Sequence, residues 1–293
     1  MKKSKGIRTE TLYKIFIYVT LIALAITIII PVAWVFLASI KENAEFYGNP
    51  WSLPEGIHLQ NFVEAFRDAQ MGEYLLNSVI VTTLSLFFLL VIALPAAYVL
   101  SRFTFMGSKF LNSFVKAGLF INVSYIAVPI FLMLLGWDSG LQELFGEGMF
   151  LNNRVILALI YASTALPFTI FLLSSYFVTL PSDFEEAASI DGAGHFRTMF
   201  SIMLPMAKPS IIIVILFNFL LFWNEYILAL TLMPGENKTL PVGLLNLLAA
   251  ERAAVNYGPM YAGMVIVMLP TLILYIIVQK RLTQGMTVGG VKG

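Results

Sequence analysis

The sequence contains no cysteine and only two histidines among its 293 residues. The absence of cysteine excludes disulfide frameworks, thiolate zinc sites, cysteine nucleophiles and iron–sulfur clusters. The two histidines, His58 and His195, form neither an HExxH motif nor a cluster that would hold a catalytic metal. We therefore expect no metal site and no cofactor in this chain.

Charged residues are also scarce, at 12% of the chain, and the formal net charge is only +1. So small a net charge argues against a nucleic-acid-binding protein, because such proteins concentrate basic residues on one face. Apolar residues make up 59% of the sequence, and the mean hydropathy is +0.84. An ordinary soluble domain is roughly half apolar and a quarter charged, so this composition predicts a protein of the lipid bilayer.

A phosphate-binding loop of the form Gly-x4-Gly-Lys-Ser/Thr is missing as well. The sequence also offers no convergent set of nucleophile, base and metal ligands. We therefore predict that the chain is not an enzyme and that any ATP hydrolysis is carried out by another chain.

What the sequence does contain is a series of long apolar segments. Each approaches or exceeds the ~20 residues that a helix needs to cross a bilayer, and none alternates polar with apolar residues as barrel strands do. They lie at about residues 15–40, 79–100, 114–135, 155–178, 211–232 and 260–278. The sequence predicts an all-α integral membrane protein with about six transmembrane helices, forming a single domain over residues 1–293.

Prolines lie inside several of these segments, among them Pro95, Pro129, Pro167 and Pro270. Each proline frees a carbonyl from the helical ladder and favours a kink, which transporters use to move half-helices. Membrane helices also carry more proline than soluble ones without any such role. Hinges and ordinary packing both remain open at these positions.

The distribution of lysine and arginine predicts the orientation. If the amino terminus is cytoplasmic, the inner segments hold Lys2, Lys3, Lys5, Arg8, Lys14, Arg102, Lys109, Lys116, Arg197, Lys208, Lys280, Arg281 and Lys292. The outer segments then hold only Lys41, Arg67, Arg154, Lys238 and Arg252. The positive-inside rule therefore places both termini in the cytoplasm.

The first external segment, residues 41–77, contains the sequence Asn49-Pro-Trp-Ser-Leu-Pro54. Its prolines predict a rigid extended turn, and the stretch after it predicts a short amphipathic helix capped by Asn61. Trp51 is either an anchor at the membrane interface or a contact for a partner.

A cytoplasmic loop over residues 181–209 carries the most specific pattern. Ser182 and Glu185 have the spacing of a capping box, and Gly192 suits the left-handed residue that ends a helix. A second helix is predicted after the turn, with an apolar stripe of Phe196, Met199, Phe200 and Met203. Pro205 and Pro209 would end it.

This exposed helix pair needs something to cover its apolar stripe. The lipid interface is one candidate, since amphipathic connectors often lie there. The first half of the loop is acidic, however, at Asp183, Glu185, Glu186 and Asp191. Because the cytoplasmic leaflet is itself negative, repulsion favours a socket on another protein.

The same loop resembles the EAA loop of binding-protein-dependent importer permeases. Glu186-Ala187-Ala188, then Gly192, Ile202 and Leu204-Pro205 match each defining position of that motif. The resemblance implies a type I ATP-binding-cassette (ABC) importer whose coupling loop docks on the ATPase subunits. By the same resemblance, the coupling residues are Glu185, Glu186, Ala187, Ala188, Asp191, Gly192, Ile202, Leu204 and Pro205.

Other stretches are similar to the carbohydrate permeases of the maltose and glycerol-phosphate type. They include Asn49-Pro50-Trp51, Trp223-Asn-Glu-Tyr226, Thr239-Leu-Pro-Val-Gly243, Tyr257-Gly-Pro-Met260 and the tail from Gln279 to Gly293. This resemblance implies three partners besides the lipid bilayer: a second, similar permease, a dimeric ATP-binding-cassette ATPase that binds the ATP, and an extracytoplasmic sugar-binding protein. It also implies the inner membrane of a bacterial cell.

Inside the fifth predicted crossing lies the most polar membrane cluster, formed by Asn218, Trp223, Asn224, Glu225 and Tyr226. A carboxylate in the membrane costs ~2.5 to 3.5 kcal/mol near the centre of a helix, so it should face a cavity or a partner. Aromatic faces and polar acceptors together suit a sugar. Alternatively, Glu225 holds two permease subunits together at the outer interface.

Asn122, Ser124 and Tyr125 in the third predicted crossing are a second polar group, which packing between helices would also explain. The most concrete function is a permease subunit that imports a sugar or oligosaccharide by alternating access. The alternatives are a permease for amino acids or peptides, and a secondary transporter driven by an ion gradient. An ion-driven transporter would require paired ionisable residues inside the membrane, whereas Glu225 is nearly the only such residue in the predicted crossings.

Overall fold

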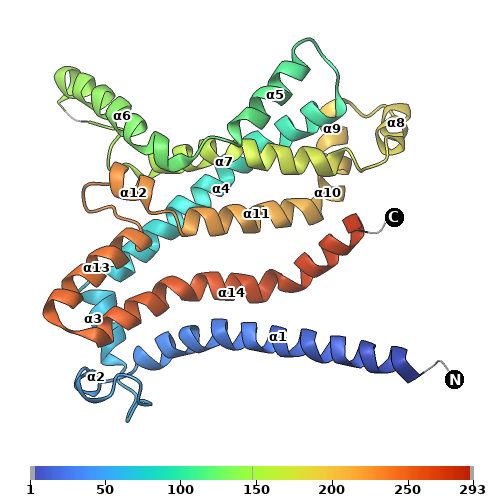
Figure 1. Ribbon diagram of the computed structural model, residues 1–293. Helices are drawn as coiled ribbons and strands as arrows, with labels where there is room; N and C mark the ends of the chain where they lie inside the picture. Colours follow the sequence, from blue (N-terminus) through green and yellow to red (C-terminus); the bar gives the residue numbers. More distant parts are fainter. Residues whose placement is uncertain (1–3, 147, 291–293) are drawn as a thin grey trace. The chain divides into compact units, whose positions relative to one another are not determined.

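The computed structural model of the protein describes residues 4–146 and 148–290. Over these residues every regular element is a helix (Figure 1), which confirms the predicted all-α fold. The elements are α1 (Ser4–Ala38), α2 (Glu45–Gly48), α3 (Gln60–Arg67), α4 (Met71–Arg102), α5 (Ser108–Gly118), α6 (Val123–Phe145), α7 (Arg154–Phe177), α8 (Asp183–Ile190), α9 (His195–Thr198), the π-helix η1 (Met199–Met203), α10 (Leu204–Met206), α11 (Lys208–Trp223), α12 (Ile227–Leu232), α13 (Leu240–Ala254) and α14 (Tyr257–Gly290). The last tail residues, 291–293, lie outside the described part of the chain.

Five of the described helices are long and apolar enough to cross a membrane, namely α1, α4, α6, α7 and α14. A sixth span results if residues 195–206 and α11, which meet at an angle of 75°, are counted as one bent crossing. The prediction of about six crossings is confirmed. All five of these helices continue through a proline, at Pro31 in α1, Pro95 in α4, Pro129 in α6, Pro167 in α7 and Pro270 in α14.

The third crossing starts later than predicted. The expected segment, residues 114–135, is divided between α5 and α6, and α6 begins only at Val123. Asn122 caps this new helix, because its side-chain oxygen accepts a hydrogen bond from the backbone nitrogen of Ser124. Apolar composition alone does not reveal such a break, since Leu119, Phe120 and Ile121 between the two helices are themselves apolar.

The prediction of the fifth crossing as one continuous helix is also wrong. It was expected over residues 211–232, but α11 ends at Trp223 and α12 begins at Ile227. Neither proline nor glycine lies in the interval from Asn224 to Tyr226. The break therefore has another cause, which lies in the contacts of Glu225 described below.

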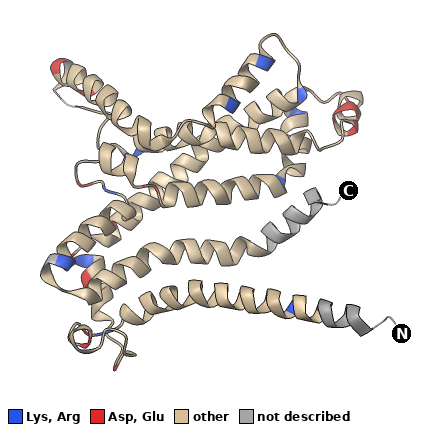
Figure 2. Cartoon of the chain, in the orientation of Figure 1, with Lys and Arg blue, Asp and Glu red and all other residues tan. Residues whose placement is uncertain are grey.

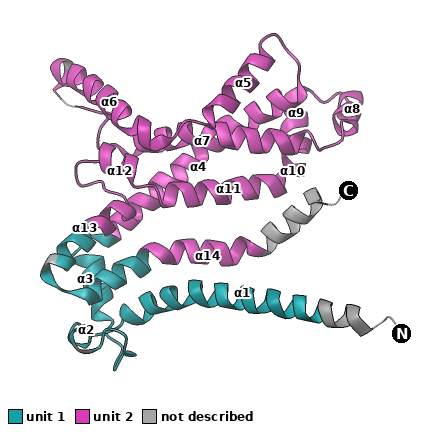
Figure 3. Ribbon diagram, viewed as in Figure 1, with its two compact units in different colours: residues 1–71, 246–266 teal, residues 72–245, 267–293 magenta. Residues whose placement is uncertain are grey.

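Contacts divide the chain into two compact units (Figure 3). Unit 1 contains the described residues up to 71 together with residues 246–266, and unit 2 contains residues 72–245 with the remainder of α14. The prediction of a single domain over residues 1–293 stays a prediction.

In unit 1 the predicted external segment is folded around two buried polar side chains. Asn61 lies inside α3 instead of capping it, and its amide donates to the carbonyls of Ser39 (2.9 Å) and Lys41 (2.8 Å). The predicted cap is wrong because α3 already begins at Gln60, one residue before Asn61. Lys41 is fully buried, and its ammonium donates to the Pro50 carbonyl and lies over the ring of Trp34. Buried charge is tolerated when it is paired in this way.

Unit 2 has a core built on α4, α7 and α11. Small residues on α4 and α7, such as Ala93, Ala97, Ala158 and Ala162, are almost fully buried. Small side chains let membrane helices approach closely, so that dispersion contacts and polar bonds hold them together. One such bond joins α11 to α7, since the amide of Asn218 donates to the Thr169 hydroxyl at 3.0 Å.

Candidate functional site

The loop between α7 and α11 forms the predicted helix, turn and second helix. Asp183, Glu185 and Glu186 occupy the first turn of α8, where negative charge complements the positive end of the helix dipole. Gly192 has a φ of +75°, and the backbone nitrogen of Ala193 donates to the Ala188 carbonyl at 2.9 Å. The left-handed residue predicted at Gly192 is therefore present, and it ends α8.

The predicted capping box at the start of α8 does not form. Ser182 makes no side-chain capping bond, and its φ and ψ are −70° and −21°, in the helical region where a capping residue is not normally found. The carboxylate of Glu185 instead reaches back to the end of α4. It accepts a hydrogen bond from the Tyr98 hydroxyl at 2.8 Å and lies 3.4 Å from Nε of Arg102. The contact with the charged Arg102 therefore replaces the local capping interaction with Ser182 that the sequence predicts.

The predicted apolar stripe on the second helix is divided between two faces. Met199 and Met203 are buried in the core, whereas Phe196 and Phe200 are 79% and 60% exposed. From Met199 to Met203 the chain is a π-helix, in which each hydrogen bond spans one residue more than in an α-helix. The ordinary helical period on which the prediction depended therefore does not apply.

The nine predicted coupling residues occupy three environments. Ala188 is buried, and Glu185, Ile202 and Leu204 are partly buried. The exposed members are Glu186, Ala187, Asp191, Gly192 and Pro205. Four of the exposed members lie at the turn or in α8 before it, whereas Pro205 lies in α10.

Large apolar side chains that the sequence did not single out also lie exposed on the same loop. Ile190, immediately before the turn, is 87% exposed, and Phe184 is 41% exposed. With Phe196 and Phe200 they bracket Gly192 on both helices. Figure 2 shows acidic residues on α8 and basic residues on α5. This combination of exposed apolar and acidic side chains is suited to binding another protein.

The break in the fifth crossing is held by its own carboxylate. Glu225 accepts hydrogen bonds from the backbone nitrogens of Leu228 (2.9 Å) and Ala229 (3.2 Å), which are the free donors at the start of α12. Its other partner is the buried Tyr161 hydroxyl, at 2.6 Å. Glu225 is thus satisfied within this chain, and no sequence pattern pointed to Tyr161 as its partner.

The remaining members of the predicted polar cluster separate into buried and exposed groups. Asn218 is buried against Thr169, and buried Trp223 donates from its indole nitrogen to the Val267 carbonyl at 3.2 Å. Asn224 and Tyr226, on either side of Glu225, are exposed. The structure therefore brings the five residues together, but it leaves only these last two available for a ligand among them.

The second predicted polar group lies at the start of α6. Asn122 is used as the cap of that helix, and Tyr125 is 82% exposed. Tyr125 and Tyr226 both present exposed aromatic rings with hydroxyl groups.

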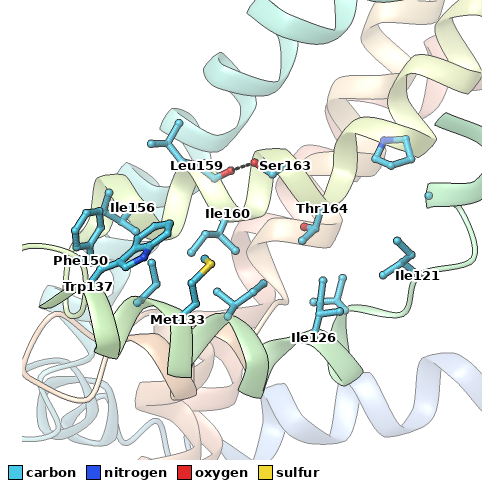
Figure 4. Close-up of a pocket in the computed structure, with 15 residues that line it drawn as sticks. Ile121, Ile126, Met133, Trp137, Phe150, Ile156, Leu159, Ile160, Ser163 and Thr164 are labelled. Atoms are coloured by element: carbon cyan, nitrogen blue, oxygen red, sulfur yellow. Dashed lines mark hydrogen bonds between the residues drawn. The ribbon is translucent and has the colours of Figure 1, made fainter. Parts of the chain in front are cut away.

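A cavity of about 440 Å³ lies between α6 and α7 (Figure 4), and the sequence did not predict it. Its walls are almost entirely apolar, including Trp137 and Phe150 at one end. The two hydroxyls in the wall are already used, because Ser163 donates to the Leu159 carbonyl and Thr164 to the Tyr161 carbonyl. A sugar would find few free polar partners there.

Metal ligands do not gather in the described part of the chain. No group of three or more histidine, cysteine, aspartate or glutamate side chains lies together among the described residues. The absence of a metal site in the whole chain stays a prediction.

Residues 71–288 match the family described as "binding-protein-dependent transport system inner membrane component". The chain belongs to this family. The helical spans and the exposed loop thus belong to a transport permease of the inner membrane.

Two relatives of the permease match along nearly the whole chain. The diacetylchitobiose uptake system permease protein NgcG of Streptomyces coelicolor is 37% identical over 270 residues, which cover 92% of this chain and 86% of the relative. The trehalose/maltose transport system permease protein MalG of Thermococcus litoralis is 30% identical over 291 residues, covering 98% and 99% of the two chains.

The permease also has a structural counterpart in a bacterial ABC transporter involved in the import of the acidic polysaccharide alginate. The two chains superpose with a TM-score of 0.78 at 24% identity, covering 93% of this chain and 97% of the other. At that identity the similarity shows a shared fold.

Proposed function

We propose that this permease carries a sugar or oligosaccharide into the bacterial cell by alternating access, as one subunit of an ATP-driven importer. The two relatives are named for the transport of diacetylchitobiose and of trehalose and maltose, and both are similar along nearly their full lengths. These names favour sugars over the alternative cargo classes, amino acids and peptides. Membership of a binding-protein-dependent family likewise favours ATP-driven import over an ion-coupled mechanism.

The observation that carries the proposed coupling role is the exposed turn at Gly192. Two short helices meet there at a left-handed residue and present Ile190, Phe196 and Glu186 to the exterior of the chain. Such a surface is costly to leave in water and is too acidic for a negative lipid leaflet. A cleft on the ATPase subunit would cover it. Closure of the ATPase dimer would then move the loop and, with it, the crossings.

The other components follow from what this chain lacks. Without a phosphate-binding loop, the permease would bind no ATP and hydrolyse none, so both tasks fall to a dimeric ATPase. A second permease would complete the translocation path, and an extracytoplasmic sugar-binding protein would deliver the cargo. The permease itself would need no cofactor or metal.

Both termini would lie in the cytoplasm. Lysine and arginine concentrate in the segments that this orientation places inside, including Arg102, Lys109 and Lys116. The same orientation puts the α8 loop on the cytoplasmic side, where an ATPase is available.

The path of the sugar would pass the break between α11 and α12. Asn224 and Tyr226 are exposed there, and an amide beside an aromatic ring can accept hydroxyl hydrogens and stack on the C–H face of a sugar. Glu225 would act indirectly, by holding the break open. Tyr125 would be a further contact on α6.

Reconstitution tests the proposal. The permease would be assembled in liposomes with its ATPase, second permease and binding protein, and uptake of radiolabelled diacetylchitobiose, trehalose and maltose would be measured. We expect uptake of at least one sugar that requires ATP and all the components. Uptake by this chain alone, without an ATPase, would contradict the proposal.

A further inference from the structure

The carboxyl end of α4 contacts both helices of the exposed loop. Tyr98 and Arg102, one helical turn apart on α4, meet the carboxylate of Glu185 on α8. The ring of Phe103, the residue after α4, packs edge-on against the ring of His195 on α9 with 5.4 Å between centroids. One end of one transmembrane helix therefore supports the loop on both sides of Gly192.

The Glu185 contacts are well protected from water. Tyr98 is 2% exposed, and the side chains of Arg102 and Glu185 are 12% and 22% exposed. Hydrogen bonds to ionised groups are short and strong in such surroundings. Arg102 also donates from Nη2 to the Leu180 carbonyl at 2.7 Å, which fixes the connection between α7 and α8.

Glu185 and Glu186 are adjacent but have opposite roles in this geometry. Glu186 is exposed on the outer side of α8, whereas Glu185 points toward the bundle and is used by Tyr98 and Arg102. A partner that docks on α8 would therefore meet Glu186 and would push on α4 through Glu185.

We propose that Tyr98, Arg102 and Glu185 form a rigid link that passes the motion of α8 to α4 and stays closed throughout the transport cycle. The inference rests on the proposed function, because it assumes that an ATPase moves α8. Glu185 is then a positioning residue within this chain, and the contact with the ATPase belongs to its neighbours on the loop. Coupling needs such a physical connection between the driven element and the element that moves.

Two variants test the link in the reconstituted importer. Tyr98→Phe removes one hydroxyl, and Glu185→Gln removes the charge that pairs with Arg102. We expect each variant to bind the ATPase and hydrolyse ATP normally, while the sugar transported per ATP falls roughly fivefold or more, the lower range of allosteric coupling. Tyr176→Phe, which removes a hydroxyl from the end of α7, is the matched control and should transport normally.

An unchanged ratio of sugar to ATP in both variants would overturn the link. Poor assembly of Glu185→Gln would leave Tyr98→Phe as the deciding variant, since it changes a single buried atom. Loss of ATPase binding in Tyr98→Phe would also overturn the inference, because it would show a role in docking instead of transmission.

The absence of native cysteine permits a second test that needs no knowledge of the cargo. In the variant Tyr98→Cys/Glu185→Cys, the two positions can be bridged with a short methanethiosulfonate cross-linker. A rigid link predicts the same cross-linking yield in the nucleotide-free and ATP-bound importer, and recovery of transport per ATP after bridging. A yield that drops in one state, or a bridge that blocks transport, would show that the contact must open.

The experiments distinguish a failure of the link from a failure of the proposed function. Failure of the unmodified permease to bind any ATPase, or transport without one, would refute the proposed function itself. Failure of the link appears only in variants of an importer that works.

Discussion

Helices in unit 2 are interrupted at two points beside an acidic residue. One point follows Asp191 at the end of α8, the other contains Glu225 between α11 and α12, and the two are stabilised in different ways. At the end of α8, Asp191 and Gly192 lie exposed, and the turn depends on the backbone freedom of glycine. Between α11 and α12, Glu225 accepts hydrogen bonds from Tyr161 and from two backbone nitrogens. The first break is open to a partner, and the second is completed within the chain.

This difference indicates what each break is for. An internal network that satisfies every donor makes a local structure rigid, which suits a fixed feature of a translocation path. A turn whose neighbouring apolar side chains stay exposed is suited to a docking surface. Substitutions at the first break should therefore act on coupling, whereas loss of the Glu225 carboxylate at the second should act on stability.

The largest expected effect is at Gly192. In Gly192→Val a β-branched residue would have to adopt a φ of +75°, at a cost of about 1–2 kcal/mol. The turn would escape the strain by changing shape, and we expect sugar uptake to fall to background with normal membrane insertion.

Gly194→Ala is the matched control for this variant. Gly194 has an ordinary φ of −73°, and a β-carbon there would meet nothing within 4 Å. Its uptake should stay near that of the unmodified permease. Normal uptake by Gly192→Val would contradict the proposal that the first break acts on coupling.

A smaller effect on uptake, together with a loss of stability, is expected at the second break. Glu225→Ala removes the cap of α12 and leaves the buried Tyr161 hydroxyl with only the backbone carbonyl of residue 225, at 3.5 Å, which together should cost about 2–3 kcal/mol. Thermal unfolding of the purified permease would measure the loss. Glu225→Gln keeps one acceptor and should lose less, and equal stability of Glu225→Ala and the unmodified permease would contradict the structural role.

The two faces of the second loop helix give a more direct contrast. Phe196→Ala should weaken binding of the ATPase about tenfold, as for a typical interface hot spot, without changing thermal stability. Met199→Ala, three residues away in the core, should lower thermal stability instead. Titration of the ATPase onto the permease in detergent, beside thermal unfolding, measures both. A common effect of the two variants would argue against separate faces.

The smallest effect is expected at Asn224. Its amide already donates one hydrogen bond to the Leu220 carbonyl, which leaves its oxygen and a second hydrogen for a sugar. Asn224→Ala should raise the half-saturating sugar concentration about fivefold, the equivalent of one ordinary hydrogen bond. Ser163→Ala, in the apolar cavity, should leave uptake unchanged. Equal responses of the two variants would remove Asn224 from the sugar path.

Features that depend on neighbouring residues in the sequence were predictable. The long apolar segments located the spans, because a helix needs a fixed number of apolar residues to cross a bilayer. Gly192 was predictable as a left-handed residue, since the chain supplies glycine directly after a short acidic helix. Exposure of Glu186 and Asp191 follows from their charge.

Features that depend on distant partners were not predictable. The prolines marked candidate hinges, yet the helices continue through Pro95 and Pro167, and the break lies at Glu225. Glu225 bonds to Tyr161, 64 residues earlier in the chain. Likewise, Glu185 contacts Tyr98 and Arg102, and it does not form the predicted capping box with Ser182.

The sequence by itself determined that this protein lies in a membrane, that it is helical, and that an acidic hinge-linked pair of helices connects two spans. Hydropathy and turn conformation are properties of short stretches of chain, so they can be deduced without a fold. Only the tertiary structure decided how the polar groups pair in hydrogen bonds. That pairing determines whether a given carboxylate faces the interior of the chain or a partner. A buried hydrogen bond requires two groups to meet in space, and their separation along the chain does not reveal that meeting.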